Sequence, residues 1–143
     1  MTLRWRNQDH IRKWFFHSDV ITPEQHQAWF KRYLQQDDDY VFIIEEVAAT
    51  LRPVGQVAIY HIDWAARQAE FGRLMIGEPE AIGRGLARAA TGLLTDMAMD
   101  TLGFREIYLE VFADNVPALT IYTACGFQIT GRRDNILHMS KAR

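Results

Sequence analysis

The chain has 143 residues, a formal net charge of −2 at pH 7 and one cysteine. This length predicts a single domain spanning 1–143, and the near-neutral charge argues against nucleic acid or a membrane surface as a partner. The hydrophobic share of 48% and charged share of 24% predict a globular protein that folds without disulfides. A lone cysteine favours a reducing compartment, and neither a leader-like segment nor a membrane-length apolar run is visible, so we expect a cytoplasmic location.

The first part of the chain predicts short helices. Asn7 or Asp9 can cap the first of them. Thr22-Pro23-Glu24-Gln25 has the sequence of a capping box and predicts a helix from Pro23 to about Gln35. The acidic run at 37–39 that follows is expected to form a solvated turn.

Strand signals follow, each rich in β-branched and aromatic residues or bounded by turn residues. The predicted strands are Tyr40–Val47, Gly55–His61 and Arg67–Ile76, with a turn at 48–53 and a break at 77–80.

A long amphipathic helix is predicted from about Gly85 to Gly103. An alternating strand at 106–113 comes next, and then a short helix that Asn115 caps. Two closing strands are expected near 127–130 and 136–140. This order of elements predicts an α+β fold with a mixed sheet.

The segment Gly83-Arg84-Gly85 lies between a strand and the start of the long helix. Glycines allow close backbone approach, and the first helical turn offers unpaired N–H groups and a positive dipole end. A pyrophosphate fits such a turn, and Arg84 and Arg88 can add charge-assisted contacts. The segment matches neither the P-loop nor the dinucleotide-binding fingerprint.

A second segment, from Asn115 to Phe127, follows the alternating strand at 106–113. Together with the glycine turn it resembles the GNAT superfamily of acyl-CoA-dependent N-acyltransferases, over about residues 70–131. The resemblance implies a mixed, mostly antiparallel central sheet flanked by helices. It also implies a shortened first strand, because Met1-Thr2-Leu3 can supply only the end of the strand that opens the family's fold.

The resemblance implies acetyl-CoA as co-substrate, with its pyrophosphate in the glycine turn and its pantetheine arm near the second motif. Ile82 departs from the family's usual Gln or Arg, so we expect some loss of cofactor affinity. The implied cofactor-binding residues are Leu74, Met75, Ile76, Ile82, Gly83, Arg84, Gly85, Leu86, Ala87, Arg88, Asn115 and Ala118.

The implied reaction is direct attack of an amine on a thioester, so Cys125 has no nucleophilic role. Tyr122 is the expected general acid for the leaving thiolate, and a backbone N–H of 74–76 is expected to meet the oxyanion. Glu70 is the first candidate for the base, with Glu110 and His26 as rivals. No histidine shows the spacing of a metal site, so no metal is expected.

The acceptor is expected against the amino-terminal helices. Three segments resemble the branch that N-acetylates nucleotide-linked amino sugars: Trp5-Arg6-Asn7, the His-x-x-Trp-Phe segment that begins at His26, and Glu70-Phe71-Gly72. Leu74 departs from that branch, which can carry a tyrosine at this position. The resemblance implies a UDP-linked 4-amino sugar, with its nucleotide bound by Arg6, Arg12 and Lys13 and its sugar by His26, Trp29 and Phe71.

Two other functions stay open at this point: acetylation of protein amino termini, as by ribosomal-protein acetyltransferases, and non-catalytic acyl-CoA binding. Members of the superfamily are often dimers, so a homodimer is also expected by analogy.

Overall fold

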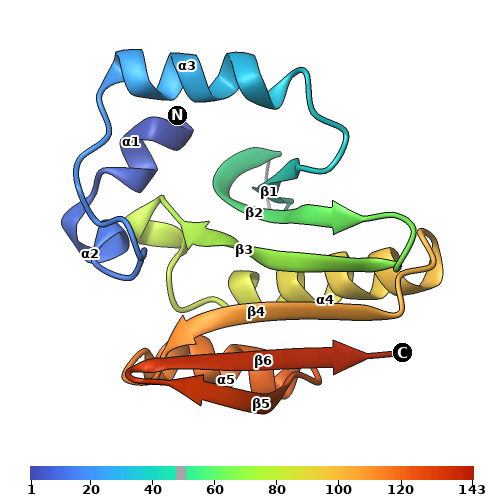
Figure 1. Cartoon of the computed structure of the whole chain (residues 1–143). Coiled ribbons are helices and arrows are strands. Elements are labelled where there is room, and N and C mark those ends of the chain that lie inside the picture. Colours follow the sequence, from blue (N-terminus) through green and yellow to red (C-terminus); the bar gives the residue numbers. More distant parts are fainter. Residues whose placement is uncertain (48–50) are drawn as a thin grey trace.

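The computed structural model describes residues 1–47 and 51–143, which include a six-stranded sheet of order β1-β2-β3-β4-β6-β5 (Figure 1). Neighbouring strands are antiparallel except β3 and β4, which are parallel. The predicted α+β fold with a mostly antiparallel sheet is therefore confirmed. The strands are β1 (Tyr40–Glu46), β2 (Arg52–Asp63), β3 (Gln68–Ile76), β4 (Glu106–Phe112), β5 (Gln128–Arg133) and β6 (Ile136–Ala142).

Helices flank this sheet. In Figure 1, α4 and α5 lie behind it, α1 and α2 lie beside one end of β3, and α3 runs along the top. None of the helices among the described residues is long and apolar enough to cross a membrane. The helices are α1 (Thr2–Arg6), α2 (Asp9–Arg12), α3 (Pro23–Tyr33), α4 (Leu86–Asp100) and α5 (Val116–Ala124), and a 3₁₀ turn covers Pro79–Ala81.

Strands β3 and β4 are paired only at one end. Their register stops at Glu70, whose partner is Tyr108, and beyond it the strands diverge toward the left of Figure 1. A bulge in β3 accompanies the divergence, because β2 residues Gln56 and Ala58 pair with Met75 and Gly72. Bulges bend a strand and increase its local twist, so this one helps to open a wedge in the sheet.

The amino terminus differs from the prediction. Residues 1–3 do not supply the end of a strand, because the chain opens with helix α1. Trp5 is fully buried on this helix, and its indole Nε1 donates to Glu78 Oε1 at 2.8 Å. A β-carbon added to Gly77 would lie 1.9 Å from Trp5 Cγ, so the indole rests directly on the backbone after β3. This tertiary contact stabilises helix α1, which local sequence signals do not predict.

Three further predictions were wrong in detail. The predicted Asn7 or Asp9 cap is absent, because Asn7 instead donates to the Ile21 carbonyl at 2.7 Å and accepts from the Ile21 amide at 2.8 Å. In the predicted turn at 48–53, residues 48–50 lie outside the described residues, and Arg52 already belongs to β2. The acidic run is not wholly solvated, because Asp39 is buried against Arg73.

Other local predictions were confirmed. Thr22 and Gln25 form both hydrogen bonds of the capping box of α3, at 3.1 and 2.9 Å. Gly85 is the N-cap of α4, and the Asn115 side chain accepts from the Ala118 amide at the start of α5.

Candidate active site

A cavity of about 360 Å³ lies in the wedge between β3 and β4. Its walls come from these strands, from the starts of α4 and α5, and from the segment at 10–16. Nine of the residues predicted from the sequence line it: Phe71, Leu74, Met75, Ile76, Ile82, Ala87, Asn115, Ala118 and Tyr122.

The remaining lining residues were not in the predicted set, apart from Glu110, which was a rival for the base. Several are aromatic and come from the segment after α2, whose density of rings was the signal available in the sequence. They are His10, Ile11, Trp14, Phe15, Phe16, Tyr60, Gly72, Arg73, Glu110, Val111, Pro117 and Ile121.

The glycine turn opens toward the start of α4. Gly83 and Gly85 adopt φ values of 80° and 76°, and a β-carbon added to either would meet no atom within 4 Å. No side chain caps α4, so its first-turn amides have no side-chain acceptor. This exposed backbone fits the pyrophosphate of coenzyme A.

The side chains around the turn have contacts that were not predicted from the sequence. The Arg84 guanidinium contacts the Glu46 carboxylate, with Nη2–Oε2 at 2.8 Å and Nη1–Oε1 at 3.1 Å, so it is already paired. Arg88 is exposed on α4, and Leu86 packs against the core. Ile82 is 50% exposed at the cavity wall.

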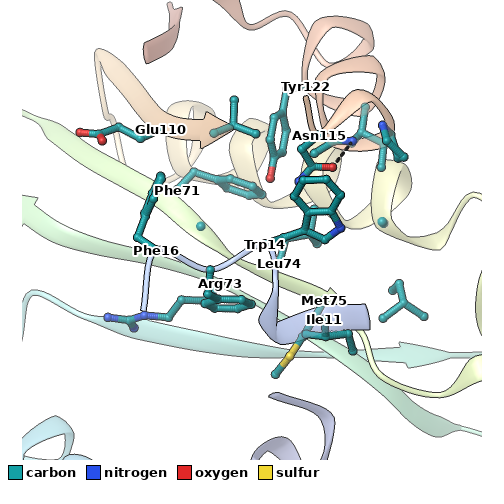
Figure 2. A pocket seen from close by; sticks show the side chains of 18 of the residues that line it. Ile11, Trp14, Phe16, Phe71, Arg73, Leu74, Met75, Glu110, Asn115 and Tyr122 are labelled. Atoms are coloured by element: carbon teal, nitrogen blue, oxygen red, sulfur yellow. Dashed lines mark hydrogen bonds between the residues drawn. The ribbon is translucent and has the colours of Figure 1, made fainter. Parts of the chain in front are cut away.

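Tyr122 lies on α5 and is only 8% exposed. Its ring meets those of Phe71 and Phe127 edge-on, at centroid distances of 5.8 and 5.9 Å. Figure 2 shows its hydroxyl pointing toward Phe71 inside the cavity. Burial raises the pKa of Tyr122, so the phenol carries its proton at neutral pH.

Glu70 is not among the residues that line the cavity. Its Oε2 accepts a hydrogen bond from the Tyr60 hydroxyl at 3.2 Å, and its Oε1 lies 2.9 Å from His61 Nδ1. Burial, followed by the charge of Glu70, raises the pKa of Tyr60. Glu110 does line the cavity, and its carboxylate lies 3.8 Å from Arg133.

Arg73 sits in the bulge with a φ of 53°, a left-handed conformation that a non-glycine residue adopts at a cost. Its guanidinium binds both carboxylate oxygens of Asp39, at 2.7 and 3.0 Å, and lies 4.1 Å from the Tyr60 ring centroid. Gln56 Nε2 donates to the Arg73 carbonyl at 3.2 Å. These contacts hold the bulge and therefore the backbone of 74–76 that follows it.

The residues predicted to bind the nucleotide are engaged with their own loop. Arg6 is buried, donates to the His17 carbonyl and lies over the Phe15 ring at 4.3 Å. Arg12 pairs with Asp9 at 2.9 Å and also donates to the Ser18 carbonyl at 2.9 Å. Neither arginine lines the cavity.

The predicted sugar-binding residues are divided between two places. Phe71 lines the main cavity, whereas His26 and Trp29 stack on α3 with centroids 5.7 Å apart and do not line it. Trp29 lines a second cavity of about 210 Å³, together with Asp39 and Arg73. Among residues 1–47 and 51–143, no group of three or more His, Cys, Asp or Glu is arranged to hold a metal ion.

Comparison with known proteins shows the family of this chain. A family model described as acetyltransferase (GNAT) domain matches residues 1–128. Spermidine N(1)-acetyltransferase of Vibrio cholerae is 26% identical over 121 residues, which are 85% of this chain and 68% of that protein. The Escherichia coli K12 protein of the same name is 29% identical over 87% of this chain, and the match spans 64% of its length.

Solved structures agree on the fold. The V. cholerae spermidine N-acetyltransferase in complex with CoA and spermine superimposes with a TM-score of 0.85 at 23% identity, covering 98% of this chain and 86% of that one. Another structure of the V. cholerae enzyme is described as dodecameric. A Methanocaldococcus jannaschii domain gives a TM-score of 0.83 at 20% identity, over 99% and 89% of the two chains. The chain therefore belongs to the GNAT acetyltransferase family and is an N-acetyltransferase whose acetyl donor is acetyl-CoA.

Proposed function

We propose that this enzyme acetylates a primary amine of a small aliphatic polyamine by direct attack on the thioester, with Tyr122 as general acid. The observation that carries the proposal is the charge of the cavity wall. Of the described residues that line it, only Glu110 bears a carboxylate, whose contact with the exposed Arg133 is long at 3.8 Å, and the one guanidinium, that of Arg73, is neutralised by Asp39 at 2.7 Å. A wall of this charge favours a cationic acceptor. The names of the Vibrio and Escherichia relatives support the same substrate class.

The co-substrate supplies an activated acetyl group as its thioester. The turn at Gly83 and Gly85 and the first amides of α4 would bind its pyrophosphate, and the backbone of 74–76 would line its reactive end. Tyr122 would give its proton to the leaving sulfur. This transfer would replace the thiolate anion of the leaving group with a phenolate anion in the same buried surroundings. It would therefore add little desolvation cost.

The amino-sugar acceptor predicted from the sequence has lost much of its physical basis. Arg6 and Arg12, which were to bind the diphosphate, donate to backbone carbonyls and so have fewer donors left for a ligand. The aromatic wall of Trp14 and Phe16 still offers a stacking surface for a sugar or a base. A nucleotide-linked amino sugar therefore belongs in the test as a competing acceptor.

One assay tests the proposal. The enzyme is incubated with acetyl-CoA and, separately, with spermidine, spermine, a UDP-linked 4-amino sugar and an amino-terminal peptide. Release of the free thiol of coenzyme A is followed, and mass spectrometry of the products detects an added acetyl group. We expect acetylated polyamine and at least tenfold lower rates with the other acceptors. Faster acetylation of the sugar or the peptide would overturn the polyamine assignment, and thiol release without any acetylated product would indicate hydrolysis only.

A further inference from the structure

Tyr60 and Glu70 lie on the face of the sheet opposite to the Phe71 and Tyr122 side. Tyr60 and Glu70 are register partners on β2 and β3, so their side chains project from the same face. The neighbouring pair, Ile59 and Phe71, projects from the other face and is buried in the core. An amine that enters from the Tyr60 face would therefore meet the thioester from the side opposite to the general acid.

The Tyr60 hydroxyl reaches the main cavity by crossing Gly72. A β-carbon added to Gly72 would lie 2.5 Å from the Tyr60 hydroxyl oxygen, so only glycine leaves the ring this position. Gly72 and Tyr60 both line the main cavity, whereas Glu70 does not. The phenol therefore stands between the cavity and the carboxylate that it contacts at 3.2 Å.

The same carboxylate leads outward to solvent. Glu70 Oε1 lies 2.9 Å from Nδ1 of His61, whose side chain is 67% exposed. His61 lines the second cavity, which shares Arg73 with the main cavity. The chain Tyr60–Glu70–His61 thus connects the main cavity with an exposed imidazole through two hydrogen-bond contacts.

We propose that Tyr60 is a catalytic residue that relays the proton of the acceptor ammonium to Glu70. The inference rests on the proposed function, because an aliphatic amine arrives protonated and must lose a proton before it attacks. One N–H bond of the ammonium breaks as a new O–H bond forms at Tyr60, while the original phenol proton passes to Glu70 Oε2. His61 positions Glu70, and its Nδ1 takes the proton from the Glu70 carboxyl while its Nε2 releases one to solvent. Glu70 is thereby restored as a carboxylate, and Tyr60 stays neutral throughout.

The electrostatics agree with a relay rather than with a phenolate base. Burial and the charge of Glu70 both raise the pKa of Tyr60, so the free phenolate is disfavoured. A concerted transfer avoids that anion, because the phenol accepts one proton as it donates another. The other charged or titratable groups that face its ring are Arg73 and His61, and Tyr122 acts on it electrostatically from the other side of the sheet.

Tyr60→Phe tests the relay, because it keeps the ring over Arg73 and removes only the hydroxyl. With spermidine as probe at pH 7, we expect kcat to fall on the order of 10²-fold, the usual size of a general-base contribution. Glu70→Gln should cost a similar factor, and the double variant should be no slower than the slower single variant, because both act in one step. The KM for acetyl-CoA should not change.

The dependence on pH separates a relay from a structural role. The loss in Tyr60→Phe should shrink as the pH is raised toward the pKa of the ammonium, about 10, because the amine then arrives neutral. Tyr40→Phe is the control: it removes an exposed phenol on β1 that does not line the main cavity. It should leave kcat unchanged.

Two results would overturn the relay alone: wild-type kcat in Tyr60→Phe, or a loss of the same size at every pH. Wild-type enzyme that acetylates none of the amines would overturn the proposed function and the relay together. Melting temperatures of all variants check that the fold is retained.

Discussion

Tyr122 combines two properties, burial and a hydroxyl that is free to meet a ligand. It is almost wholly buried, and its hydroxyl faces a cavity rather than a polar side chain. Burial keeps the proton on the phenol across the physiological range, since it raises the pKa of the group. The residue is therefore suited to give up a proton only when an anion forms beside it.

For Tyr122→Phe we expect kcat to fall by about 10²- to 10³-fold and the Kd for acetyl-CoA to change by less than about twofold. The ring and its contacts with Phe71 remain, so the fold should be intact. Steady-state kinetics and calorimetric titration with coenzyme A provide the measurements. Parallel losses in turnover and binding would show that the hydroxyl only shapes the cavity. Tyr40→Phe, at an exposed position on β1, is the control.

Ile82 is the residue at which the glycine turn departs from the family pattern, and it is half exposed at the cavity wall. Replacing it with arginine would add a cation beside the turn that is expected to bind the pyrophosphate. Ile82→Arg should lower the Kd for coenzyme A about three- to tenfold at low salt, and the gain should fade at high ionic strength. Ile82→Leu should leave the Kd unchanged. An unaltered Kd in Ile82→Arg would mean that the phosphates bind elsewhere.

At the scale of single elements, the bulge in β3 is held by residues from separate strands. Asp39 lies just before β1 and Gln56 lies in β2, and both fix Arg73 in its left-handed conformation. The residues that follow line the main cavity. A long-range ion pair therefore determines the shape of the strand at which the chemistry is expected.

Removing the Asp39 carboxylate should destabilise the protein. The Arg73 guanidinium is three-quarters buried, and in Asp39→Ala it would lose its bidentate partner. We expect the free energy of unfolding to fall by about 3 kcal/mol, as for other broken buried pairs. Urea denaturation gives the value, and Asp37→Ala, two residues earlier and exposed, should change it little. A loss below about 1 kcal/mol would show that water replaces the partner.

These elements also show what could be predicted from the sequence. The capping box of α3, the cap of α5 and the glycine start of α4 depend on neighbours within a few residues, and each was predicted correctly. The Asp39–Arg73 pair spans 34 residues, and Tyr60 meets Glu70 only because β2 and β3 pair. Such contacts follow from register and packing, which no local pattern specifies. The sequence did not predict that the aromatic residues at 14–16 line the main cavity, for the same reason.

At the scale of the whole molecule, the amino-terminal segment is part of the domain rather than an appendage. Helix α1 is short, yet Trp5 is fully buried and joined to Glu78 by its indole N–H. Ile11, on α2, packs with Trp5 and Met75 in a small second core, and it also lines the main cavity. The expected homodimer stays a prediction.

Trp5→Ala should therefore weaken both the fold and the site. We expect a loss of about 3–5 kcal/mol in the free energy of unfolding, typical of a deleted core tryptophan. Thermal or urea unfolding monitors it, and Leu34→Ala, at a position that is 66% exposed, is the control. If the loss were no larger than in the control, α1 would be only loosely attached.

The contact between Trp5 and Gly77 has a genetic consequence. Because any β-carbon at 77 would overlap the indole, alanine there is tolerated only when position 5 shrinks. Two changes that are each harmful should thus partly compensate when combined, although 72 positions separate them in the chain. In a selection for active clones from a library randomised at both sites, large side chains at 5 should recur only with glycine at 77.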